Sequence, residues 1–114
     1  MKVKRAVALA DELRPNMLDE ELKVSFVYEL EAEIAEMMKK PIPENTWPRD
    51  DATLLLPFPY DNAYVLYLCA KIDNANEETS LYMNDMVAAN TAISQVKAWW
   101  RRNNAPVESK DWKV

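Results

Sequence analysis

The stretch PYDNAYVLYLCAKIDNANEETSLYMNDMVAANTAISQVKAWWRRN, residues 59–103, decides the fold of this chain. Mostly apolar residues recur along it at alternating steps of three and four: Val65, Leu68, Ile72, Ala75, Thr79, Tyr82, Met86, Ala89, Ile93, Val96 and Trp100. This spacing is typical of one buried face of an α-helix. Pro59 precedes the series, and Asn103, Asn104 and Pro106 follow it. We therefore predict helical structure over residues 61–103.

The length of this segment raises the question of whether it forms one helix or two. A straight helix over 61–103 would be roughly 60 Å long, which is long for so small a domain. The polar run DNANEETS, residues 73–80, is the expected place for a bend or a break. Because the apolar series keeps its phase through this run, a bend is favoured.

Two shorter helices are predicted in the first part of the chain. Residues 3–14 place Val3, Val7 and Ala10 on one stripe with Leu13–Arg14, and Pro15 ends this helix. Residues 19–40 follow, with Asp19 as N-cap and Pro41 as the stop. The expected apolar stripe of this second helix is Leu22, Phe26, Leu30, Ile34 and Met37–Met38.

The remaining segments lack helical periodicity. Residues 41–59 contain five prolines and are predicted to be a connector, in which TLLLPF fits either a short edge strand or an apolar strap over the core. Residues 105–114 are predicted to be an extended arm with Trp112 as its apolar anchor. The sequence thus predicts an all-α fold, with one helical domain over 1–104 packed as a small bundle and a C-terminal arm.

Composition argues against several classes of function. The chain has no histidine and no glycine, so it lacks the usual general base, the commonest metal ligand and phosphate-cradling loops. We predict no catalytic residues, no cofactor and no metal. A net charge of −5 disfavours a face for duplex DNA, since binding relies on neutralising phosphates. No apolar run approaches the ~20 residues of a membrane span, so we expect a soluble intracellular protein with no membrane partner.

Several polar or reactive residues have structural explanations. Cys69 is the only cysteine and sits in an apolar run, so it is predicted to be a buried structural residue. Glu29, Glu33 and Glu36 share one helix face and are predicted to be solvated. The same expectation applies to the carboxylates of the polar run, namely Asp73, Glu77 and Glu78.

Aromatic and arginine side chains are the candidates for a protein interface. Trp99, Arg101 and Arg102 lie at the end of the long helical segment, and such residues are enriched at interface hot spots. Core packing and stacking on nucleic acid are the alternatives for this group. Trp47 in the connector and Trp112 in the arm either fold back on the domain or dock on a neighbour. Tyr60, Tyr64 and Tyr67 share a second face, expected to pack on the first two helices or a partner.

The chain resembles a family of small proteins from tailed phages and prophages. The resemblance covers about four-fifths of the chain and is carried by Ala10–Asn16, Asp19, Glu21–Leu22, Glu29–Glu31, Pro59–Asp61, Tyr64, Tyr67–Leu68, Ala70–Asp73, Trp99 and Arg102. The connector over 41–56 and the tail after 104 are the variable parts. Many relatives have a glycine near position 77, which this chain lacks, and its absence further favours a continuous or gently bent helix.

The family is similar to phage head–tail connector, or adaptor, proteins. This resemblance implies a structural virion protein at the capsid vertex that forms a homo-oligomeric ring between portal and tail and extends the DNA channel. Its partners would be the portal protein and tail or neck components, with DNA only passing through. Two other functions remain open: a DNA-packaging component similar to a small terminase subunit, and a coiled-coil interaction module.

Overall fold

The computed structural model describes residues 1–104, which form four α-helices. The helices are α1 (Val3–Leu13), α2 (Glu20–Met37), α3 (Asn62–Ala75) and α4 (Thr79–Asn103). In this part of the chain the only β-type pairing is an isolated bridge between Lys2 and Thr53. The predicted all-α class is therefore confirmed. The predicted arm, residues 105–114, lies outside the described residues.

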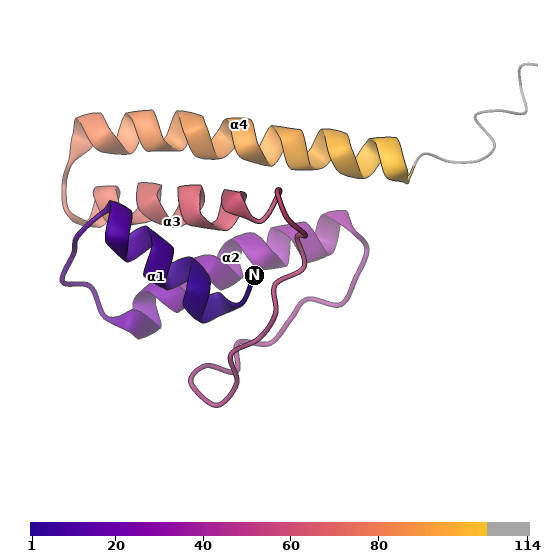
Figure 1. Cartoon of the computed structure of the whole chain (residues 1–114), viewed down its shortest axis with the longest axis horizontal. Helices are drawn as coiled ribbons and strands as arrows, with labels where there is room; N and C mark the ends of the chain where they lie inside the picture. The colour runs from indigo at the N-terminus through magenta and orange to yellow at the C-terminus, as the bar shows by residue number, and fades with distance from the viewer. Residues whose placement is uncertain (105–114) are drawn as a thin grey trace, which may run out of the picture.

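Helix α3 is central and packs against each of the other three helices. Figure 1 shows α4 running antiparallel to α3 on one side, while α1 and α2 cover the other side. Tyr64, Leu68 and Ile72 of α3 are completely buried. On α4 only Ala89 and Val96 are fully buried, so this long helix contributes one stripe to the core and leaves most of its surface outside.

Residues 61–103 form two helices, and the break falls within the polar run 73–80, where the sequence predicts a bend or a break. The favoured bend is wrong, because the chain reverses direction between Ala75 and Thr79. Glu77 adopts a left-handed conformation with φ of 59°, which a helix cannot continue through. Its N–H donates to the carbonyl of Asn74 at 3.2 Å, and the N–H of Glu78 donates to the carbonyl of Asp73 at 2.9 Å. These bonds define a Schellman motif, which usually has glycine at the left-handed position.

The regular spacing of the apolar series does not distinguish a bent helix from two helices, because a tight antiparallel hairpin also places both apolar stripes on the inside. Val65, Leu68 and Ile72 face the core from α3, and Ala89 and Val96 face it from α4. Periodicity reports which face of a helix is buried. It does not report whether consecutive turns belong to the same helix.

Helix α2 ends earlier than the predicted residue 40, for the same reason. Lys39 is left-handed, with φ of 58°, and the N–H of Lys40 donates to the carbonyl of Ala35 at 2.8 Å. This second Schellman motif ends the helix at Met37, before Pro41 can act. Asp19 precedes α2 as predicted, although its side chain makes no capping hydrogen bond.

The buried face of α2 is also rotated from the predicted stripe. Leu22 is 41 % exposed, whereas Val24 and Val27 are completely buried. Residues four apart advance by about 40° around a helix of 3.6 residues per turn, so a row of such residues winds away from one face. On α1, Leu13 is likewise exposed, although Val3, Val7 and Ala10 are buried as predicted.

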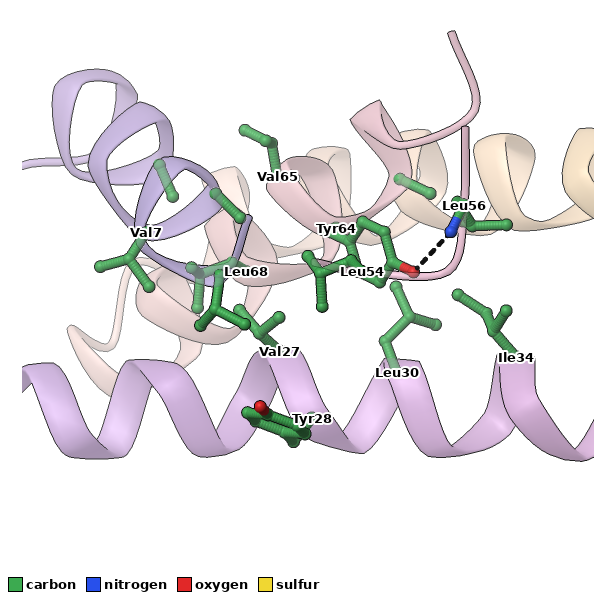
Figure 2. Packing of buried hydrophobic residues seen from close by; sticks show 14 of the residues in the cluster. Val7, Val27, Tyr28, Leu30, Ile34, Leu54, Leu56, Tyr64, Val65 and Leu68 are labelled. Carbon is green, nitrogen blue, oxygen red and sulfur yellow. Dashed lines mark hydrogen bonds between the residues drawn. The ribbon is translucent and has the colours of Figure 1, made fainter. Parts of the chain in front are cut away.

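The connector between α2 and α3 contains the strap that the sequence offered as one of two alternatives. Leu54 donates its N–H to the carbonyl of Met1 at 2.8 Å, and Val3 donates to the carbonyl of Ala52 at 3.0 Å. Leu54 and Leu56 are buried, and Figure 2 shows both beside Tyr64, above Leu30 of α2. The strap thus closes one side of the core.

Candidate interaction surface

Trp99 on α4 is partly engaged inside the subunit. Its ring stacks on Tyr60, two residues before α3, with centroids 4.7 Å apart and planes at 21°. Trp100 meets the edge of Trp99 at 6.0 Å. Both tryptophans are half-buried and pack against the hydrophobic core. This contact fixes the last turns of α4 to the beginning of α3.

Arg101 and Arg102 are exposed on the last turn of α4, where cations complement the helix dipole. Lys97, one turn earlier, is also exposed, and no acidic residue occurs from Met86 to Asn104. The end of α4 is therefore a basic patch on an acidic protein. The other predicted interface residues belong to other segments: Trp47 is a half-buried connector residue against the core, and Trp112 lies outside the described residues.

The outward surface of α4 carries no charge over its first four turns. The exposed residues between Thr79 and Gln95 are Thr79, Ser80, Leu81, Met83, Asn84, Val87, Asn90, Thr91, Ser94 and Gln95. The one charged residue in this interval, Asp85, points inward to Arg14. Depletion of charge is the compositional signal of a protein interface.

The large exposed apolar side chains of residues 1–104 belong to two regions of the molecule. Six belong to the end where α1 joins α2 and α3 joins α4, which we call the hairpin end: Leu13, Met17, Leu22, Leu81, Met83 and Val87. The other two lie in the connector between α2 and α3, a region that we call the connector end: Ile42 and Phe58. Met17 is 98 % exposed and Phe58 is 87 % exposed, so neither side chain is used within the subunit.

A buried charge cluster holds the hairpin end together. Arg14 donates through Nε and Nη2 to the two carboxylate oxygens of Asp85, each at 2.9 Å. The same Nε lies 3.3 Å from a carboxylate oxygen of Asp73, whose side chain is 2 % exposed. Burial, together with the neighbouring Asp85, raises the pKa of Asp73 to about 6, and Arg14 opposes this rise. The expectation that Asp73 is solvated is therefore wrong.

A second buried carboxylate fixes the strap. Glu31 is 3 % exposed and accepts hydrogen bonds from the N–H of Leu55 at 2.9 Å and from the hydroxyl of Tyr64. The same hydroxyl accepts the N–H of Leu56 at 3.2 Å, the contact drawn in Figure 2. Burial raises the pKa of Glu31, and the two hydrogen bonds oppose that rise. Burial and the adjacent Glu31 also raise the pKa of Tyr64, which keeps its hydroxyl protonated.

Other predicted placements hold. Glu29, Glu33 and Glu36 are exposed on α2, so the solvated acidic face is confirmed. Cys69 is 3 % exposed, and burial raises the pKa of its thiol to about 11, so it is an unreactive thiol at neutral pH. The buried carboxylates Glu31 and Asp73 were missed as structural residues. The position of Asp73 in the sequence gives no sign that its side chain is buried. Glu31 lies between Leu30 and Ala32, and apolar neighbours are a weak sign of burial.

Across residues 1–104, no three His, Cys, Asp or Glu side chains are grouped to hold a metal ion. In the same part of the chain, no helix is both long enough and apolar enough to cross a membrane. No protein-family model, curated protein or solved structure matches this chain.

Proposed function

We propose that this chain is a structural virion protein, a head–tail connector that assembles as a ring between portal and tail. The proposal combines the sequence resemblance with one structural observation. Exposed apolar side chains lie in two separate regions of the subunit, the hairpin end and the connector end, and are not buried within it. Two different patches that complement each other give a heterologous contact, and such contacts close into a ring when the rotation allows.

Several residues that carry the resemblance make contacts that hold the helices and the strap together, as expected for residues that maintain a common fold. Arg14 and Asp73 tie the α1–α2 loop to the α3–α4 turn, and Glu31 and Tyr64 fix the strap. Asp11 accepts from Lys23 at 2.8 Å and thereby joins α1 to α2. A family that retains these residues retains a fold, while its variable connector and arm suit contacts with differing partners.

Charge distribution is compatible with a ring around DNA. The exposed carboxylates of α2 are Glu20, Glu21, Glu29, Glu33 and Glu36. An acidic wall repels phosphates, so it would line a channel without gripping the passing duplex. In the proposed ring the acidic face of α2 is directed toward the channel. The hairpin end and connector end then meet neighbouring subunits.

The first test is the copy number of this protein in purified phage particles, measured by quantitative mass spectrometry against portal and major capsid protein. Parity with portal, with the protein retained in particles, is the expected result. Absence from particles would overturn the connector function and favour a packaging or cellular role.

The ring contact has its own test in the purified protein. Met83→Asp at the hairpin end and Phe58→Asp at the connector end should each block self-association. A mixture of the two variants should form a 1:1 complex, because each retains the patch that the other has lost. A contact made of two identical patches would instead be blocked by only one of the two substitutions, and the mixture would not form a 1:1 complex. Ala8→Asp, on the exposed side of α1, is the matched control and should assemble normally.

A further inference from the structure

An apolar hollow of about 180 Å³ lies between α2 and α4. Its apolar lining consists of Leu30, Ile34 and Met37 from α2 and Ile93 and Val96 from α4. A dry cavity of about 150 Å³ lined by such side chains is large enough to hold benzene. The hollow between α2 and α4 therefore has the size for one aromatic side chain.

The rim of this hollow carries both signs of charge. Glu33 and Glu36 stand on the α2 wall, and Lys97 stands on the α4 wall. All three side chains are exposed. An occupant that fits the rim as well as the lining has an aromatic anchor flanked by residues of both charges.

The last ten residues of the same chain, APVESKDWKV, have this composition. Trp112 is their only aromatic residue, and Lys110, Asp111 and Lys113 supply both charges beside it. A tryptophan buries 150–250 Å² when it is placed in an apolar site, so it is the strongest anchor this segment contains.

The distance along the chain permits this contact within one subunit. Lys97 at the rim is seven residues before Asn104, which is about 10 Å along a helix. Trp112 is eight residues after Asn104, and eight extended residues reach about 27 Å. A short tether also gives an effective concentration in the millimolar range, which favours the hollow of the same subunit over that of a neighbour.

We infer that Trp112 occupies the hollow between α2 and α4 of its own subunit. The bound indole covers the half-buried Met37 and Ile93 from water, and the charged residues beside it meet the rim formed by Glu33, Glu36 and Lys97. This inference concerns the free subunit and does not rest on the proposed virion function.

The test compares the full chain with its Trp112→Ser variant by NMR. In the wild type, the methyl groups of Ile34, Ile93 and Val96 should show ring-current shifts and nuclear Overhauser contacts to an indole, and the variant should lose both. Ile93→Lys, which places a cation in the hollow, should move the Trp112 indole signal to the position of a free tryptophan. Val87→Lys makes the same kind of change on the outward surface of α4 and should leave that signal unmoved.

Two outcomes would overturn the inference. Methyl signals that are identical in wild type and Trp112→Ser would show that the indole does not enter the hollow. Contacts that vanish on dilution, together with a dimer in sedimentation analysis, would show that Trp112 binds a second subunit instead. Neither outcome depends on the copy number in phage particles, so failure here is distinguishable from failure of the proposed function.

Discussion

Replacing Asp73 by Asn removes a buried negative charge at the turn between α3 and α4 and keeps the shape of the side chain. The native cluster places two carboxylates, Asp73 and Asp85, on the single cation of Arg14. The pKa of about 6 for Asp73, against its ordinary value of 3.8, corresponds to at most about 3 kcal/mol of unfavourable interaction in the ionised form. The amide of an asparagine can donate to Asp85, as the protonated acid does.

We therefore expect Asp73→Asn to raise the free energy of unfolding by about 1–3 kcal/mol near neutral pH and to change it little near pH 4. The sign follows from proton binding. Because the native pKa of Asp73 is raised, the native state binds more protons than the unfolded chain from about pH 4 to about pH 6, and stability falls as pH rises through this window. Glu31, whose pKa is also raised, contributes a slope of the same sign in both proteins.

The assay is urea unfolding followed by circular dichroism at several pH values across this window. Arg14→Gln is the matched variant, because it leaves both carboxylates without their cation. It should lose about 2 kcal/mol or more at neutral pH, and less in acid. A lower stability of Asp73→Asn than of wild type at neutral pH would refute the reasoning. An unchanged pH slope would refute it as well, since Asp73 would then not be the titrating group.

Three further predictions concern side chains whose environments differ sharply. Tyr64→Phe should lower the free energy of unfolding by about 2–3 kcal/mol in urea, because it leaves the buried N–H of Leu56 without an acceptor. Tyr28→Phe should leave this free energy unchanged, since the Tyr28 hydroxyl is buried without a partner in residues 1–104. An equal loss of stability in both variants would contradict the assignment. Glu77→Gly should raise the stability by about 0.5–1 kcal/mol, since glycine adopts the left-handed conformation without strain; Glu77→Ala serves as control and should give no gain. Cys69 should resist alkylation by iodoacetamide at neutral pH in the folded protein and react on unfolding, as followed by mass spectrometry; rapid labelling of the native state would show that the thiol is not buried.

The two apolar ends and the hollow differ in whether they are free to bind a partner in the isolated subunit. The hairpin end and connector end remain exposed in the isolated chain, so they are available to neighbours without rearrangement. The hollow between α2 and α4 is occupied by Trp112 in the free subunit under our inference.

The sequence by itself determined the helical class, the position of the connector and the burial of Cys69. These follow from local signals, because an apolar period of about 3.6 residues requires a helix with one buried face. Proline fixes backbone dihedral angles wherever it occurs. The strap at Leu54 and Leu56 was offered as one of two alternatives, since an apolar run in a connector has to cover something.

Only the tertiary structure decided where the helices end and which charges are buried. Glu77 and Lys39 take left-handed conformations that favour glycine, so the sequence gives no sign of the two Schellman motifs. The strain at Glu77 is offset by packing α4 back against α3, which brings together residues distant along the chain. Asp73 is buried because the α1–α2 loop brings Arg14 to it from 59 residues away. Such long-range pairs leave no local pattern, which is why this carboxylate was expected in water and is found in the core.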